Sequence, residues 1–220
     1  MYAIVNSKRP AKPGPTPRYT REHVLAVALE VIEAEPANSF ALRKVADALD
    51  INVMTLYGYA KSKSDLLEGA ALLALSRAHV DPDPDAAWDE QLGIAVRQVE
   101  VVCRQYPHLA TLVIGRNAQA PGLFQIRERM LEILLGAGFE SRSALRAMGV
   151  LACYSLGFAE AQNNVAGAGG TLPPLPAEDF PHLTALADDY AEHASDAAFE
   201  IGLDHLIDGL RRELQAQNRS

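Results

Sequence analysis

The chain of 220 residues is long enough for one large domain or a small domain joined to a larger one, and its composition, 49% hydrophobic and 22% charged, is that of a globular protein. No apolar run approaches the roughly 20 residues that span a bilayer, and the first 20 residues lack the apolar segment of a secretory signal, so we expect a cytoplasmic protein without a membrane partner. The net charge is −8, but residues 1–63 carry nine Lys/Arg against six Asp/Glu, so the charge does not exclude a polyanionic partner for this end.

Residues 1–19 are predicted to form a flexible basic arm. Prolines at positions 10, 13, 15 and 17 prevent helix and sheet, and the first 21 residues contain five basic residues and no acid. Two interpretations remain open: the arm contacts a polyanion such as DNA, or it is a solvated tail.

Helical periodicity begins at residue 20, where Thr20 is placed to cap a helix that ends near Glu35. A short helix over about 41–49, a tight turn at Asp50-Ile51-Asn52 and a second short helix over Val53–Tyr59 follow. A longer helix is expected from Lys63 to about His79.

The remaining periodic segments are also helical, which predicts an all-α fold. They cover about 86–106, 107–115, 122–137, 141–163, 178–192 and 195–216, and residues 163–176 are expected to form a flexible linker. The last helix carries a regular apolar stripe that is either core or one side of a twofold four-helix bundle. Cys103 and Cys153 are expected to be buried, reduced thiols.

The helices over 41–49 and 53–59, joined by a tight turn, have the arrangement of a helix-turn-helix. In such a motif the second helix enters the major groove of DNA. Leu56 is expected to point inward over Val45, Ala46 and Leu49, and Lys61 and Lys63 follow where a phosphate ridge would lie. Alone this is a moderate signal, because helical bundles contain many short helices joined by turns.

The stretch FALRKVADALDINVMTLYGYAKSKSDLL (residues 40–67) resembles the DNA-binding signature of the tetracycline-repressor (TetR) family of bacterial transcription regulators. The segments at 87–92, 138–162 and 198–214 also resemble the C-terminal domain of its tetracycline-binding members. The resemblance implies an N-terminal three-helix DNA-binding domain at 20–66 and an effector-binding and dimerisation domain at 67–220. It further implies a homodimer that binds a palindromic double-stranded operator and is released by a small molecule.

Carried over by position, the resemblance places seven residues at the DNA: Arg43, Val53, Met54, Thr55, Tyr57, Tyr59 and Lys63. Arg18 is added as a candidate DNA contact from the basic arm, if the arm is not simply a solvated tail. Tetracycline-binding members have glutamine and proline where this chain has Val53 and Met54. Apolar side chains favour thymine methyl groups over bidentate hydrogen bonds, so we expect a different operator sequence.

The effector is expected to differ from magnesium-tetracycline. His79 matches a drug-contacting histidine, but the magnesium-binding histidine position is Val113, and neighbouring polar positions are Ala95 and Val99. We therefore expect a more apolar effector, no metal site and no cofactor. The candidate ligand-binding residues are His79, Val99, Leu112, Val113, Arg116, Met130, Leu134, Tyr154 and Phe158. The apolar ones can equally form core, and Arg116 can equally lie on the surface.

Catalytic motifs are not found: the sequence contains no GxxxxGK[ST], HExxH or GxSxG. We therefore expect a regulator with no catalytic residues. The alternative is a helical small-molecule-binding protein or enzyme whose helix-turn-helix does not bind DNA.

Overall fold

The computed structural model describes residues 18–34, 39–78, 83, 85–114 and 121–219, and all regular structure in these ranges is helical. The predicted all-α fold is confirmed. Apart from Arg18 and Tyr19, the expected basic arm lies outside the described residues. The helices are α1 (Arg21–Glu33), α2 (Leu42–Ala48), α3 (Val53–Leu56), α4 (Lys63–Arg77), α5 (Trp88–Gln105), α6 (Pro107–Ile114), α7 (Pro121–Gly136), α8 (Ser141–Gly167), α9 (Pro181–Ala185), the 3-10 helix η2 (Tyr190–Ala194) and α10 (Asp196–Gln217).

Three of the first four helices begin at side-chain caps. Thr20, Asn52 and Ser62 accept hydrogen bonds from backbone N–H groups two or three residues further on, at 2.8–3.1 Å. Each cap satisfies an otherwise unpaired donor in the first helical turn. The Thr20 cap of α1 and the start of α4 at Lys63 agree with the prediction.

Helices α1–α4 share one apolar core, in which Leu56 is 1% exposed and lies with Val45, Ala46 and Leu49, as predicted. Gly69 allows α4 to pass close to α1, because a Cβ there would lie 2.6 Å from Leu25 Cδ2. The same core takes in Val102, Leu109 and Leu112 from α5 and α6. The first four helices therefore pack directly on the larger body.

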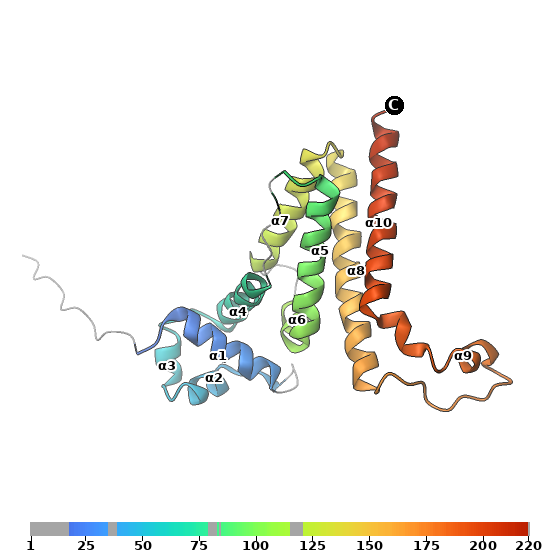
Figure 1. The fold of residues 1–220 in the computed structure, drawn as a ribbon. Helices are drawn as coiled ribbons and strands as arrows, with labels where there is room; N and C mark the ends of the chain where they lie inside the picture. Colours follow the sequence, from blue (N-terminus) through green and yellow to red (C-terminus); the bar gives the residue numbers. More distant parts are fainter. Residues whose placement is uncertain (1–17, 35–38, 79–82, 84, 115–120, 220) are drawn as a thin grey trace, which may run out of the picture.

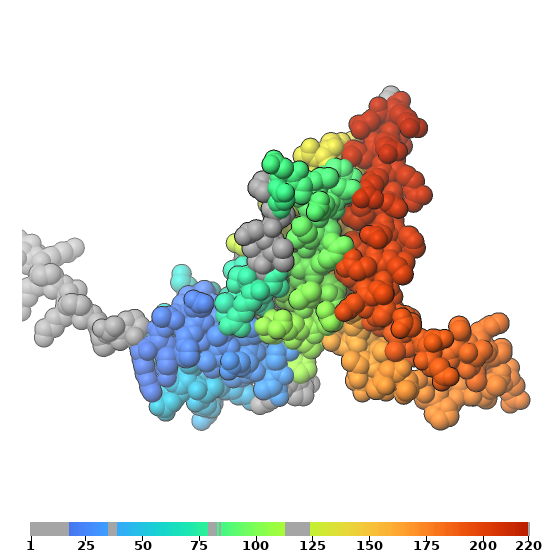
Figure 2. Space-filling model, in the orientation of Figure 1, coloured from blue at the N-terminus to red at the C-terminus, as the bar shows by residue number. Residues whose placement is uncertain are grey.

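A second core lies between α5, α7, α8 and α10, which run side by side in the body (Figure 1). α10 forms the outer edge of this bundle, and the segment containing α9 projects beyond it (Figure 2). The described helices include none that is long and apolar enough to cross a membrane.

Three expectations need correction. Residues 178–192 do not form one helix. Pro181 is tolerated only in the first turn of a helix, so α9 begins there, and α9 buries none of its residues, so no packing stabilises a longer helix. α8 continues to Gly167, so the linker begins later, at Gly169 and Gly170 with φ of +72° and +74°. Cys103 is buried as expected, but Cys153 is exposed.

Candidate functional site

The outward surface of α2 and α3 carries four of the residues that were expected to contact DNA. Met54 is 76% exposed, Thr55 and Tyr57 are exposed, and the side chain of Arg43 is 84% exposed. Val53 is half-buried against the core of the first four helices. A largely exposed side chain of α3 is therefore a thioether, which can contact a thymine methyl group but donates no hydrogen bond to a base.

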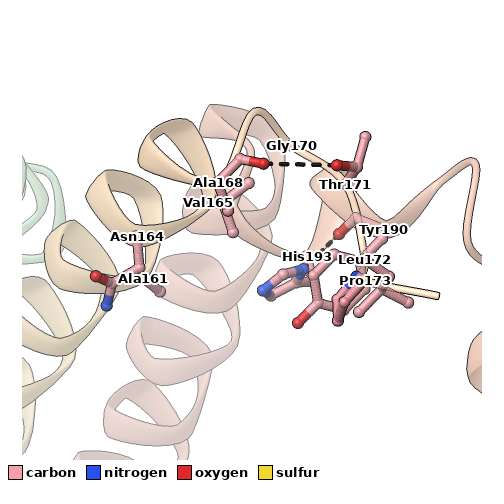
Figure 3. A pocket seen from close by; sticks show the side chains of 10 residues that line it. All are labelled: Ala161, Asn164, Val165, Ala168, Gly170, Thr171, Leu172, Pro173, Tyr190 and His193. Atoms are coloured by element: carbon pink, nitrogen blue, oxygen red, sulfur yellow. Dashed lines mark hydrogen bonds between the residues drawn. The ribbon is translucent and has the colours of Figure 1, made fainter. Parts of the chain in front are cut away.

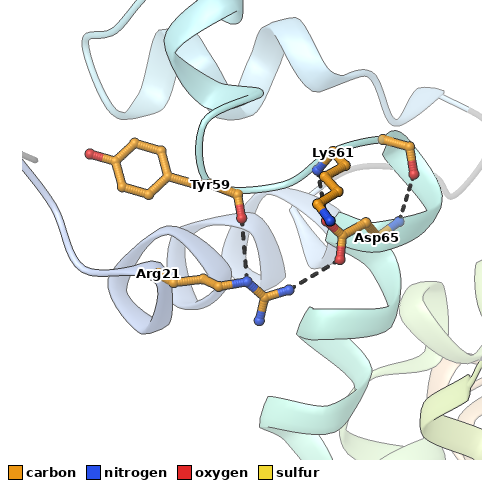
Figure 4. A network of polar contacts seen from close by, with 5 residues as sticks. Arg21, Tyr59, Lys61 and Asp65 are labelled. Carbon is orange, nitrogen blue, oxygen red and sulfur yellow. Dashed lines mark hydrogen bonds and ion pairs between the residues drawn. The ribbon is translucent and has the colours of Figure 1, made fainter. Parts of the chain in front are cut away.

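A polar network fixes this surface to the first turn of α4 (Figure 4). Arg21 Nε donates to the Tyr59 carbonyl oxygen at 3.3 Å, and an Arg21 terminal nitrogen lies 3.1 Å from Asp65 Oδ1. Asp65 Oδ2 accepts the Lys61 backbone N–H at 2.7 Å. Because Asp65 belongs to α4, Arg21 to α1, and Tyr59 and Lys61 follow α3, the network links α4 both to α1 and to the segment after α3.

Three other expected DNA contacts are engaged within the protein. The Tyr59 hydroxyl accepts the Tyr19 backbone N–H at 3.3 Å, and Lys63 Nζ donates to the Phe40 carbonyl oxygen. Arg18 lies 3.1 Å from the carbonyl oxygen and 3.3 Å from Oδ2 of Asp50, the turn residue with φ +50°. These contacts give Tyr59, Lys63 and Arg18 a structural role in the turn and its surroundings.

Helix α6 is a second connection between the first four helices and the body. The Glu33 carboxylate, at the end of α1, accepts the backbone N–H groups of His108 (3.2 Å) and Leu109 (2.8 Å) in the first turn of α6. A carboxylate at a helix N-terminus is stabilised by the unpaired N–H groups and the helix dipole. Displacement of α6 therefore acts on α1.

The cavities in the described part of the body include three of small-molecule size. The first, here named the α4 cavity, has a volume of about 350 Å³ and lies between α4, α5 and α7. The α6 cavity, about 470 Å³, lies between α5, α6 and α8 and includes both cysteines. The α8 cavity, about 360 Å³, lies between the end of α8, the following loop and η2 (Figure 3). Only the α4 and α6 cavities adjoin helices that contact the α1–α3 region.

The α4 cavity combines an apolar floor with neutral amides and one cation. It is lined by Leu72, Leu75, Ser76, Gln98, Gln125, Ile126 and Arg129. Gln98 Nε2 donates to the Leu75 carbonyl oxygen at 2.8 Å, which ties the last turn of α4 to α5. The cavity is thus placed beside a hydrogen bond that holds α4 in its present position.

One of the two thiols that line the α6 cavity, that of Cys103, is unreactive at neutral pH. Burial, with a smaller contribution from the nearby Glu100 carboxylate, raises the pKa of the Cys103 thiol to about 12. Cys103 is therefore a protonated thiol at neutral pH, which is a poor nucleophile.

The residues expected to bind the ligand do not converge on one of these cavities. Leu112 belongs to the first core and Met130 and Leu134 to the second, while Tyr154 and Phe158 stack around Phe199. Val99 is half-buried on α5, beside Gln98. None of these six lines one of the three cavities. His79 and Arg116 lie outside the described residues, as does the side chain of Val113.

Two weak signals in the sequence point to the cavity residues that the prediction missed. Gln98 is a neutral polar residue next to the apolar stripe of α5, and Gln125 and Arg129 are four residues apart on one face of α7. Neither pattern is specific, because amphipathic helices carry many such residues.

A polar layer holds α10 against α5 on the other side of the body. Arg97 makes a bidentate contact with Glu200, at 2.6–3.0 Å, and hydrogen bonding to Glu200 raises the pKa of Arg97 despite its partial burial. Glu100 is buried beside Arg104, at 2.9 Å. Burial raises the pKa of Glu100, Arg104 opposes that shift, and Asp196 and Glu200 add to it.

Among the described residues, no three His, Cys, Asp or Glu side chains lie close enough together to hold a metal ion. The lining of the α4 cavity supplies amide and hydroxyl oxygens beside a guanidinium, and none of its described residues has a carboxylate or imidazole. Mg²⁺ is normally held by carboxylates together with ligand oxygens and water. The described cavity therefore does not fit a magnesium chelate.

Two family models match the chain in adjacent regions. Residues 24–70 match the model for bacterial regulatory proteins of the tetR family, and residues 81–214 match the tetracyclin repressor-like C-terminal domain. The first match contains the α2–α3 surface and Tyr59, Lys61 and Asp65 of the polar network but not Arg21, and the second contains α5, α7, α8 and most of α10.

Curated relatives and solved structures agree with these matches. The tetracycline repressor protein class A from transposon 1721 of Escherichia coli is 29% identical over 202 residues, covering 89% of this chain and 92% of that protein. The repressor DrrR1 of Streptomyces coeruleorubidus is 26% identical over 157 residues, covering 70% of this chain and 57% of that protein. Apo ActR from Streptomyces coelicolor superposes with a TM-score of 0.71 at 26% identity, covering 93% of this chain and all of that one. ActR in complex with actinorhodin superposes with a TM-score of 0.67 at 25% identity, covering 89% of this chain and 96% of that one.

Proposed function

This chain belongs to the TetR family of bacterial regulatory proteins, a family of ligand-responsive, DNA-binding regulators, and from this we propose that it is a repressor released from its operator by a small molecule other than magnesium-tetracycline. The observation that carries the proposal is the placement of α4. One end of α4 is hydrogen-bonded to the segment after α3, and the other end lines a cavity.

The proposed DNA contacts fall into two groups. Met54, Thr55 and Tyr57, with Val53 at the base of α3, would lie in the major groove, and Arg43 would reach a phosphate or base. Arg18, Tyr59 and Lys63 are proposed to support the motif near the backbone of the DNA, since each has a partner within the protein.

The proposed switch uses α4 as a rigid link with two attachments. Gln98 holds its last turn to α5, and Asp65 holds its first turn to the segment after α3. An effector in the α4 cavity that displaces the Leu75 carbonyl from Gln98 would allow α4 to tilt. In a homodimer this changes the separation of the two α3 helices, which must be about 34–36 Å to occupy successive major grooves. The effector must bind the tilted state more tightly, or no population shifts.

The effector is proposed to differ from magnesium-tetracycline because the chain lacks suitable ligands where the resemblance would place them. Val113 has a hydrocarbon side chain at the magnesium-binding position, and the α4 cavity offers no described carboxylate or imidazole. Minocycline and actinorhodin are bound in the structures of other regulators of this fold, so the fold accommodates different ligands.

Dimerisation is proposed to use α8 and α10. Leu145 and Val150 on α8 and Ile201 on α10 are exposed apolar side chains on the helices that form the second core. Pairing these helices with a second copy would bury the side chains in a four-helix bundle. With this assignment residues 20–66 form the DNA-binding domain, and residues 67–220 the effector-binding and dimerisation domain.

Selection of duplexes from a random DNA library by the purified, ligand-free protein tests the proposal. We expect enrichment of a palindrome whose half-sites are about one helical turn apart, with affinity that falls steeply as salt is raised. Random duplexes of equal length serve as the control. Failure to enrich any sequence would refute the repressor assignment and favour a ligand-binding or enzymatic role for the body.

A further inference from the structure

We infer that the α4 cavity binds a small organic acid, that is, an apolar body carrying a carboxylate, sulfonate or similar anionic group. The inference rests on the proposed function in that it names the chemical class of the effector. It is argued from the charge, the hydrogen-bond donors and the shape of the cavity.

The charge of the lining is the first argument. Among the described lining residues Arg129 is the one with a charged side chain. Its guanidinium lies 3.3 Å from Glu132 on the same helix, and both side chains are about half exposed, at 48% and 59%. A terminal nitrogen of Arg129 also donates to Gln91 Oε1 at 3.1 Å, in another exposed contact. Exposed pairs of this kind contribute little to stability, so an anionic ligand can replace Glu132 at low cost. The planar guanidinium then offers two parallel N–H donors to a carboxylate or sulfonate.

The neutral polar groups of the lining also favour a ligand with hydrogen-bond acceptors. Gln98 already donates an amide N–H into the space beside Leu75, and Gln125 and Ser76 supply further donors nearby. An anionic oxygen is a stronger acceptor than the Leu75 carbonyl, because hydrogen bonds to charged groups are stronger than neutral ones. The same ligand group can therefore bind Arg129 and take the N–H of Gln98 from Leu75.

The rest of the lining requires an apolar body. Leu72, Leu75 and Ile126 form the hydrocarbon part of the cavity, whose volume of about 350 Å³ suits one small ligand. A cationic ligand would meet Arg129 without any described carboxylate in the lining. A wholly apolar ligand would remove the guanidinium from water without supplying an acceptor beyond Glu132 and Gln91.

A pair of fluorescent probes tests the inference. 8-Anilinonaphthalene-1-sulfonate and N-phenyl-1-naphthylamine share one apolar body, and only the first carries an anionic group. Both are titrated into the full-length dimer. We expect Arg129→Gln to weaken binding of the sulfonate about tenfold, the loss expected for a hydrogen bond to a charged group, and to leave the neutral probe within about twofold.

Arg127→Gln is the matched control, because Arg127 lies on the same helix two residues away and does not line the cavity. This variant should bind both probes as the native chain does. The inference is overturned if the native protein does not bind the sulfonate, if Arg129→Gln leaves its affinity unchanged, or if both probes lose affinity equally. These readouts need no DNA, so failure here is distinguishable from failure to select an operator.

Discussion

At the scale of single residues, exposure separates the side chains that can meet DNA from those that hold the motif together. Arg43 and Met54 extend from the protein, whereas Tyr59 and Lys63 make contacts within it. The sequence could place all of these near the helix-turn-helix, because the motif is local. It could not reveal the partners of Lys63 and Tyr59, since Phe40 and Tyr19 lie 23 and 40 residues away along the chain.

Arg43→Ala should weaken binding to the selected operator without changing the stability of the fold. The Arg43 side chain is 84% exposed, and its one described ion pair, with Asp47 at 4.0 Å, is also exposed. If Arg43 contacts a phosphate, the slope of log affinity against log salt should fall by about 0.9. Fluorescence anisotropy at several salt concentrations measures the slope. Arg77→Ala, on an exposed residue at the far end of α4, should leave it unchanged, and an unaltered slope for Arg43→Ala would remove this residue from the phosphate contacts.

Glu100→Gln should stabilise the protein at neutral pH. Burial raises the pKa of the Glu100 carboxyl above its ordinary value of 4.5, so the folded state favours the protonated form. The stability associated with that form is fully present below pH 4.5 and is lost as the pH rises through the raised pKa. The glutamine variant resembles the protonated form at every pH. Its melting temperature should therefore exceed that of the native chain at pH 7.5, by about 2–4 °C for each kcal/mol gained, and the difference should shrink toward pH 4.5.

Thermal melts at fixed protein concentration across this pH range measure the effect. Glu90→Gln, at an exposed position near the start of the same helix, is the control. A native protein more stable than Glu100→Gln at pH 7.5 would mean that the ion pair of Glu100 with Arg104 outweighs the cost of burying its charge.

At the scale of helices, the periodicity of apolar residues was sufficient to locate most elements to within a few residues. α5 begins at Trp88 and α10 ends at Gln217, against predicted limits of about 86 and 216. The prediction failed over 178–192, where the helical pattern has no surface to pack against and Pro181 delays the start of α9.

The α4 cavity was missed for a different reason. It is formed by side chains from α4, α5 and α7, and periodicity within one helix does not determine which face of another helix it meets.

Gln98→Leu should uncouple α4 from α5. The leucine keeps a similar volume but cannot donate to the Leu75 carbonyl, so the last turn of α4 loses its attachment. We expect operator affinity without effector to fall about three- to tenfold, as expected for a hydrogen bond worth about 1 kcal/mol, and the response to a bound ligand to be reduced.

Operator binding by anisotropy, with and without 8-anilinonaphthalene-1-sulfonate, measures both effects. Gln105→Leu, at an exposed position on the same helix, is the control and should retain native behaviour. If Gln98→Leu binds the operator as the native chain does and still responds to the ligand, the Gln98–Leu75 hydrogen bond has no part in the switch.

At the scale of the whole molecule, two polar or covalent connections join the α1–α3 region to the body, in addition to the apolar core that they share with α5 and α6. α4 is the covalent connection, and the Glu33 carboxylate at the N-terminus of α6 is the second. Both connecting helices adjoin cavities, so the body can act on the DNA-binding surface from two directions. The charge distribution and the family resemblance predict a division into two domains near residue 66, and this division stays a prediction. The sequence could not indicate the contact between Glu33 and His108, which joins positions 75 residues apart.

The exposed apolar side chains of α8 and α10 determine the last prediction, because the function of this fold requires two copies on one palindrome. Ile201 is 58% exposed on α10, at the outer edge of the body. Ile201→Asp would leave the monomer core undisturbed, because the Ile201 side chain is exposed in the single chain. It would weaken the proposed interface, because burying an unpaired carboxylate is costly. We expect its mass in solution, measured by light scattering, to fall from that of two chains to that of one. Operator affinity should fall at least a hundredfold, because a single subunit contacts one half-site and loses the gain from linked binding.

Leu135→Asp is the control, at a leucine that is 46% exposed on α7, and this variant should remain dimeric and bind the operator as the native chain does. A dimeric Ile201→Asp would exclude this part of α10 from the interface.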